Sequence, residues 1–227
     1  MILIRTVICI VVAVLVSSIA GPGAMPALAD DWRAGAAAVD ITPLEFPVKV
    51  NGGMMSRTAT QTSTPIFARA LVIQEGEAGE PLAIVVVDSC MMPRPLLDEA
   101  KQLAAQRCGI DPDRMTISAT HTHTAPSAMG ALGTDVDERY VPYLRNRLAE
   151  AIVTAAGNLE PAEIGFGATD AGQFTAVRRW IRRTDLLAED PFGNLTVQAN
   201  MHAASNWDDV TGPAGPEDPE LAAIGVR

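Results

Sequence analysis

Two of the three histidines in this 227-residue sequence stand two positions apart, in the segment ISATHTHTAPSAMG. In an extended strand the side chains of residues i and i+2 point to the same face, so His121 and His123 are predicted to present their imidazoles side by side. On a helix the same spacing would turn the two side chains roughly 200° apart. Paired imidazoles suit two of the nitrogen ligands of a tetrahedral zinc ion. The alternative from the residues alone is a pair of polar side chains at a strand end.

Two other classes of metal hydrolase use a His-x-His pair, and the sequence argues against both. The metallo-β-lactamase pattern continues with Asp-His, whereas Thr-Ala-Pro follows at 124–126. Barrel amidohydrolases carry the pair after the first strand of a fold of about 250 residues. Here several strands are predicted before His121, and the chain is shorter.

The strands and helices predicted around the histidine segment alternate along the chain. The apolar run 82–88 is typical of a central strand buried on both faces, and from 169 onward the regular pattern gives way to segments expected to form exposed loops. The alternation predicts an α/β fold, a mixed sheet with parallel crossovers and flanking helices. Strands are predicted at 34–40, 66–74, 82–88, 115–120 and 162–168, helices at 95–109 and 137–156, and a Gly/Ser/Thr-rich loop at 51–65.

The first 29 residues have the order of a secretory signal. A charged start at Arg5 precedes the apolar run 7–16, and Ala-Leu-Ala at 27–29 is typical of a cleavage site. The run is too short to span a bilayer, although an uncleaved anchor is the alternative interpretation. The sequence therefore predicts a secreted or periplasmic protein whose mature chain begins at residue 30.

The net charge of the chain limits the classes of molecule that it is expected to bind. The formal charge is −10, which argues against nucleic acid, because nucleic-acid binding needs basic patches. The same charge is a poor match to anionic lipid headgroups, but it is compatible with a neutral lipid substrate and with peripheral contact at a membrane surface. The sequence indicates no particular oligomeric state.

Two cysteines remain once the signal segment, with Cys9, is removed. Export permits a disulfide between Cys90 and Cys108. However, Cys90 follows an apolar strand and Cys108 ends a predicted helix, so two separate buried thiols are the other interpretation.

Five segments occur in the order found in the neutral/alkaline, non-lysosomal ceramidase family. Over most of the mature chain the sequence resembles the N-terminal catalytic domain of that family, so residues 30–227 are interpreted as the N-terminal part of such a domain. SATHTHTAP after an apolar strand is the most specific element. The resemblance implies that His121 and His123 bind Zn²⁺, which activates a water molecule to attack an amide carbonyl. The implied products from ceramide are sphingosine and a fatty acid. The segments are AGAAAVDITP, ARALVI, IVVVD, SATHTHTAP and LEPAEIGFG.

The resemblance also implies an arginine near the zinc, in a short Asn-Arg segment. Its fixed fork of donors would hold the substrate or the developing oxyanion. The nearest counterpart is AVRRW, so Arg178 is the candidate and Arg179 the neighbour that could replace it. Val177 stands where the family has asparagine, and a solvated basic loop is the other interpretation.

His202, in NMHAASN, is the only other histidine. In the family a third histidine, a glutamate and a tyrosine complete the zinc site downstream, and the third histidine follows another strand. The segment TGPAGPEDPELAAIGVR is predicted to lead into that strand, so we expect the domain to be incomplete at its C-terminus. His202 is then expected to line the substrate groove or to bind metal in a divergent site.

Two further features are predicted to support the site. Asp88 closes the apolar strand and is expected to face the functional edge of the sheet, where it would orient a ligating imidazole. Capping the helix that begins near Pro95 is the alternative. Gly52 and Gly53 are expected to permit close backbone packing beside the site, or to form a plain turn.

The leading functional prediction is a zinc-dependent hydrolase that cleaves the N-acyl amide bond of ceramide-like lipids. One alternative is a catalytically inactive fragment or binding module that keeps the fold. The other is a related metal hydrolase acting on a different amide or ester.

Overall fold

The computed structural model describes residues 32–227 and divides them into two compact units. The N-terminal unit comprises residues 32–164 together with 226–227, and the C-terminal unit comprises residues 165–225. The predicted export signal and Cys9 lie outside the described residues. Among the described residues, none of the helices combines the length and the hydropathy needed to cross a bilayer.

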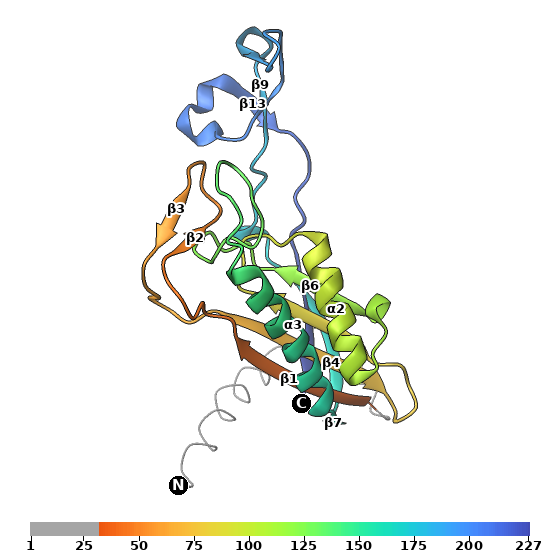
Figure 1. Ribbon diagram of the computed structural model, residues 1–227. Helices are drawn as coiled ribbons and strands as arrows, with labels where there is room; N and C mark the ends of the chain where they lie inside the picture. Colours follow the sequence, from red (N-terminus) through yellow and green to blue (C-terminus); the bar gives the residue numbers. More distant parts are fainter. Residues whose placement is uncertain (1–31) are drawn as a thin grey trace. The chain divides into compact units, whose positions relative to one another are not determined.

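A five-stranded sheet in the order β6-β5-β4-β1-β7 forms the framework of the N-terminal unit (Figure 1). β1 pairs antiparallel with β4 and β7, and β4 pairs antiparallel with β5, whereas β5 and β6 are parallel neighbours. The connection from β5 to β6 runs through helix α2 (Arg94–Cys108), which gives the predicted mixed sheet with a parallel crossover. The strands are β1 (Trp32–Asp40), β4 (Phe67–Glu75), β5 (Leu82–Val87), β6 (Met115–Ala119) and β7 (Glu160–Pro161).

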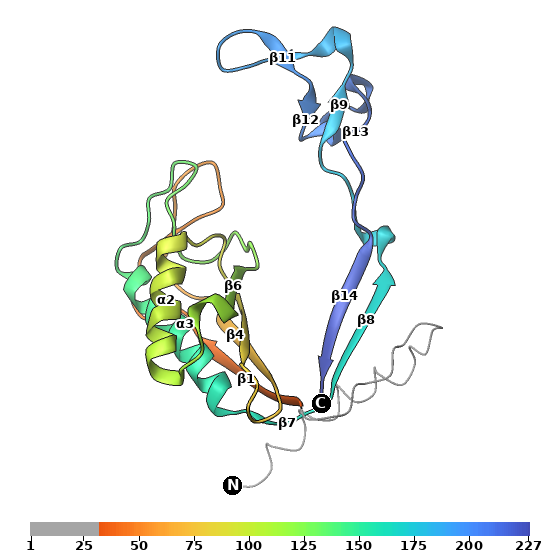
Figure 2. The same ribbon diagram turned by 90° about the vertical axis from the view of Figure 1, so that its right-hand side faces the viewer.

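Helices α2 and α3 (Tyr140–Gly157) lie side by side on the same face of this sheet (Figures 1 and 2). Pro142 lies in the first turn of α3, where a missing N–H breaks no helical hydrogen bond. Because the inward side chains recur at helical spacing, they form one stripe that packs on the sheet. In α3 that stripe is the predicted one: Tyr140, Leu144, Leu148 and Ile152 are all buried.

Burial of β5 differs from the prediction. Ala83, Val85 and Val87 are fully buried under the helices, whereas Val86, on the opposite face, is 40% exposed. Both helices cover the same face, so the sheet is buried on one side in the described structure. The expectation that residues 82–88 are buried on both faces is therefore wrong.

The predicted loop 51–65 also contains structure. Within it, β3 (Arg57–Ala59) pairs antiparallel with β2 (Val48–Val50), so the two short strands form a hairpin. An isolated bridge between Val50 and Pro126 attaches this hairpin to the loop that follows β6. The hairpin thereby brings residues 51–56 next to the histidine segment.

The C-terminal unit consists of short strands and 3₁₀ turns, and among residues 165–225 only Asn200 and Ala203 are buried. The strand predicted at 162–168 is β8, and it pairs with β14 rather than with the five-stranded sheet. A second small sheet has the order β12-β9-β13, and β10 pairs with β11. The bounds are β8 (Ile164–Asp170), β9 (Trp180–Arg182), β10 (Ala188–Glu189), β11 (Leu195–Val197), β12 (Ala199–Asn200), β13 (Val210–Pro213) and β14 (Glu220–Val226).

Candidate metal centre

The loops that follow β5 and β6 meet because these two strands are parallel neighbours and end at the same edge of the sheet. Cys90 lies just beyond the end of β5, and His121 lies just beyond the end of β6. Nδ1 of His121 is 2.8 Å from the carbonyl oxygen of Cys90, and it is 3.8 Å from the Cys90 Sγ atom. Since a carbonyl oxygen only accepts, a hydrogen bond between these atoms requires the tautomer with the proton on Nδ1, which leaves the lone pair of Nε2 available to a metal.

The two histidine rings lie together, but not for the reason expected from the sequence. β6 ends at Ala119, and His121 has φ 63°, in the left-handed region, so the segment is no longer an extended strand at the histidines. The ring centroids are nevertheless 4.8 Å apart with an interplanar angle of 87°. A left-handed non-glycine residue costs about 1–3 kcal/mol, and such strain is concentrated at functional sites.

Cys90 completes a group of three possible metal ligands. The ligand atoms of Cys90, His121 and His123 all lie within 4.8 Å of one another. The cysteine is buried and both histidines are exposed, so the group opens to solvent on the histidine side. Three protein ligands with an open side correspond to the arrangement that catalytic zinc sites use. Sequence reasoning did not identify Cys90 as a ligand.

The surroundings of Cys90 determine both its bonding partner and its protonation. Cys90 and Cys108 are both free cysteines, as the interpretation of two separate thiols expects, but only Cys90 is buried and Cys108 is half-buried. Burial raises the pKa of the Cys90 thiol, because a thiolate is less well solvated away from water. Metal ligation requires the thiolate, so binding at this group would release a proton.

Gly52 lies directly against His123. A Cβ atom at position 52 would come within 2.6 Å of the His123 Cγ atom, and Gly52 has φ 98°. The guanidinium of Arg57 donates from Nη2 to the carbonyl oxygen of His123 at 2.7 Å. The predicted close backbone packing is therefore confirmed for Gly52. At Gly53 a Cβ atom would meet nothing closer than 3.4 Å, so that glycine is not required beside the site.

Gly52→Ala is expected to weaken zinc binding roughly 10- to 100-fold, the usual cost of disturbing the support of a metal ligand. The added methyl group would displace the His123 ring, and alanine tolerates positive φ poorly. Competition with a chromophoric chelator measures the affinity. Gly53→Ala is the matched control and should bind zinc like the unchanged chain. Equal affinity in both variants would show that His123 does not bind the metal.

Asp88 has partners other than those expected. Its Oδ2 atom accepts hydrogen bonds from the Phe67 backbone N–H and from Arg69 Nη1, both at 2.9 Å. The N-cap of α2 is Pro93, with no side-chain capping bond, so the capping alternative is wrong. Among its described hydrogen bonds none goes to an imidazole, and a catalytic role for Asp88 stays a prediction.

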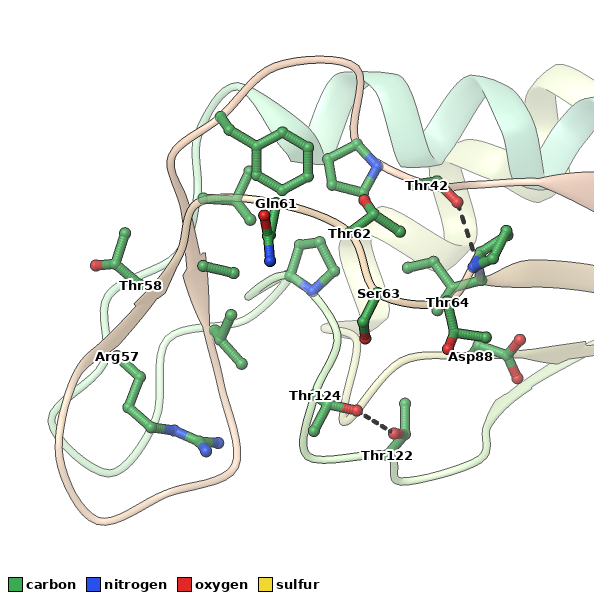
Figure 3. A pocket seen from close by; sticks show the side chains of 18 of the residues that line it. Thr42, Arg57, Thr58, Gln61, Thr62, Ser63, Thr64, Asp88, Thr122 and Thr124 are labelled. Atoms are coloured by element: carbon green, nitrogen blue, oxygen red, sulfur yellow. Dashed lines mark hydrogen bonds between the residues drawn. The ribbon is translucent and has the colours of Figure 1, made fainter.

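Thr122 and Thr124, which alternate with the histidines, line a groove of about 610 Å³ on the N-terminal unit (Figure 3). Their hydroxyl oxygens lie 3.2 Å apart. Arg57 and Asp88 also face this groove, so it offers hydrogen-bond donors and acceptors beside the histidine loop. Further hydroxyl and amide side chains in its lining are Thr42, Thr58, Gln61, Thr62, Ser63 and Thr64.

The other predicted site residues lie in the C-terminal unit. Arg178 and His202 line the same pocket, of about 570 Å³, with the Trp180 and Trp207 rings, whose centroids are 4.8 Å apart. Arg179 is not among the residues that line this pocket, and the role of Arg178 near a metal stays a prediction. The metal-binding role of His202 stays a prediction, because His202 and the Cys90 group belong to units that are described separately.

The chain matches no family model and no curated protein. Among solved structures, the neutral ceramidase from Pseudomonas aeruginosa is similar with a TM-score of 0.59 and 18% identity, over 86% of this chain and 29% of that chain. A structure described as "Ceramidase complexed with C2" gives a TM-score of 0.54 and 22% identity, over 67% of this chain and 24% of that chain. The ceramidase-like α/β fold expected from the sequence is thereby confirmed. This chain spans less than a third of either ceramidase chain.

Proposed function

We propose that this chain carries the metal-binding part of a zinc-dependent hydrolase that cleaves the N-acyl amide bond of ceramide-like lipids. The products would be a sphingoid base and a fatty acid. The observation that carries the proposal is the convergence of Cys90, His121 and His123 in a fold similar to that of ceramidases.

The donor set fits zinc. One thiolate and two imidazoles suit zinc, whereas magnesium and calcium prefer carboxylate, carbonyl and water oxygens. A bound zinc ion would supply Lewis acidity for polarising an amide carbonyl and for activating water. The chain itself orients the side chains that would bind the metal. The Cys90 carbonyl fixes the tautomer of His121, and Arg57 and Gly52 fix the backbone and ring of His123.

Arg178 is assigned the stabilisation of negative charge that develops on the amide oxygen. The support is the resemblance of AVRRW to the arginine segment of ceramidases and the position of Arg178 on a pocket with two indole rings. A guanidinium offers several donors in a fixed plane, which suits an oxyanion. The outcome expected for Arg178→Ala is slower turnover with unchanged zinc content.

A neutral lipid with hydroxyl groups suits this surface best. One structural neighbour is described as complexed with C2. The hydroxyl-lined groove offers partners for the hydroxyl groups of a sphingoid base. The net charge of −10 disfavours anionic substrates. With the export signal predicted at residues 1–29, the proposed place of action is outside the cell or in the periplasm.

A substrate panel tests the proposal. The zinc-loaded chain is incubated with a short-chain ceramide, with other acylated amines and with esters of the same fatty acid, and released fatty acid is measured. We expect release from ceramide that stops when zinc is chelated and returns when it is restored. Release from esters alone would indicate a related hydrolase instead.

The second candidate is a module that binds metal without turnover. It requires only the three candidate ligands, which all lie in the N-terminal unit. Stoichiometric zinc with no release from any substrate would establish this module and contradict the hydrolase.

A further inference from the structure

Four large apolar side chains are exposed on two neighbouring loops of the N-terminal unit. Met54 and Met55 lie between β2 and β3 and are each 78% exposed. Met129 and Leu132 lie between β6 and α3 and are 37% and 52% exposed. We call these four residues the apolar rim. Exposed apolar side chains that gather in one place are characteristic of interaction surfaces, whereas single ones are ordinary.

The two loops that carry the apolar rim are held together, so the rim is one surface. The Asn51 side-chain amide donates to the Ser127 hydroxyl at 3.4 Å and to the carbonyl oxygen of Met129. A Cβ atom at Gly133 would lie 3.5 Å from the carbonyl oxygen of Met54. Figures 1 and 2 both show the two loops next to each other.

Leu132 occupies a conformation that leucine rarely adopts. Ala131 and Thr134 exchange backbone hydrogen bonds of 2.9 and 3.0 Å, and the two residues between them, Leu132 and Gly133, have φ 52° and 81°. Two-residue turns with positive φ at both positions favour Asn-Gly. Here the favoured asparagine is replaced by a leucine that is half exposed at the tip of the turn. Local stability therefore does not explain this residue, whereas presentation of an apolar side chain does.

The rim lies beside the metal centre. Gly52, which packs on His123, is two residues before Met54, and the loop that carries Met129 and Leu132 begins with the histidine segment. Lys49 and Asp135, which lie on the two segments that carry the rim, form an ion pair of 3.7 Å. Arg57 is exposed, and its described hydrogen bonds use only Nη2. Its other N–H groups are suited to the phosphate of a headgroup.

We propose that the apolar rim inserts into the surface of a neutral, zwitterionic lipid layer and so brings the metal centre to a lipid substrate. The inference deepens the proposed function and rests on it for the identity of the substrate, but lipid binding itself is measured separately. Unbranched methionine side chains and leucine adapt to an acyl-chain boundary. The remaining N–H groups of Arg57 and the negative charge of the whole chain favour zwitterionic over anionic lipid.

Vesicle flotation with phosphatidylcholine tests the inference. The full chain should float with the vesicles, and the triple variant Met54→Ser, Met55→Ser, Leu132→Asn should bind roughly tenfold more weakly or worse, since each lost apolar insertion removes a substantial transfer free energy. Leu132→Asn alone should also weaken binding. It should leave the melting temperature unchanged or raised, because asparagine tolerates positive φ.

Phe192→Ser is the matched control, since Phe192 is 88% exposed in the C-terminal unit and is not part of the rim. The control should float like the unchanged chain, and every variant should keep its zinc. Lipid binding that persists in the triple variant would overturn the inference, as would binding only to vesicles with anionic lipid. A change of oligomeric state with unaltered flotation would also overturn it and make the rim a protein contact. Unchanged flotation of the full chain without any hydrolysis would contradict the proposed function but would still support lipid binding by the apolar rim.

Discussion

His121→Ala is expected to abolish zinc binding by this chain at micromolar concentrations. The substitution removes one of the three candidate ligands, whose donor atoms lie within 4.8 Å of one another. Because disturbing only the support of a ligand typically costs 10- to 100-fold, loss of a ligand should weaken binding by more than about 100-fold. The affinity is measured by chelator competition, and any zinc-dependent hydrolysis should disappear with the metal.

Thr122→Ala is the matched control for this prediction. Thr122 lies between the two histidines, but its side chain lines the hydroxyl-rich groove. Its replacement should leave zinc affinity close to that of the unchanged chain. If His121→Ala kept its zinc, the ligand assignment would be wrong. If Thr122→Ala lost zinc as completely, the loss in His121→Ala would be due to a disturbed loop.

Cys90→Ser is expected to remove the sulfur signature of the metal site. With cobalt in place of zinc, a thiolate ligand gives a charge-transfer band in the near ultraviolet, and this band should be present in the unchanged chain and absent from the variant. Zinc affinity should fall as well, because a serine hydroxyl is a much weaker ligand than a thiolate. The buried position of Cys90 beside His121 is the basis of the expectation.

Cys108→Ser provides the comparison for the cobalt experiment. Cys108 is a second free thiol at the end of α2, half-buried against the core. Its variant should keep the band at full intensity. A band that is lost in Cys108→Ser but kept in Cys90→Ser, or a cobalt-loaded chain with no band at all, would exclude Cys90 as a ligand.

The secondary structure could be predicted well where it depends on local pattern. The stripe in α3 was predicted from the spacing of Tyr140, Leu144, Leu148 and Ile152, and all four are buried. Burial of β5 could not be predicted in the same way, because an apolar run does not reveal which faces of a strand are covered. That depends on both helices packing on one face, which leaves Val86 40% exposed.

The histidine pair was predicted correctly as neighbours but for the wrong local reason. The pattern MTISAT continues smoothly into the histidines, and nothing in it marks the end of β6 at Ala119 or the positive φ of His121. The geometry is set by contacts that are distant in sequence, namely the Cys90 carbonyl, Gly52 and Arg57. Such contacts are tertiary and are invisible in the segment itself.

Cys90 is the residue that sequence reasoning missed, although a signal for it was present. The predicted crossover makes 82–88 and 115–120 parallel neighbours, and residues beyond the carboxyl ends of parallel neighbours converge. The same convergence led to the prediction for Asp88, but the Asp88 carboxylate accepts hydrogen bonds from Phe67 and Arg69 instead. Cys90 lies two residues beyond Asp88, so the same reasoning applied to the loop after the strand would have identified it.

We propose that Cys90, His121 and His123 together bind one metal ion. The most direct measurement is the zinc content of the full chain after loading with zinc and exhaustive dialysis, determined by elemental analysis against protein concentration. We expect one zinc per chain, which is lost in His121→Ala. A chain that is folded and yet retains no zinc, or that retains as much after His121→Ala, would contradict it.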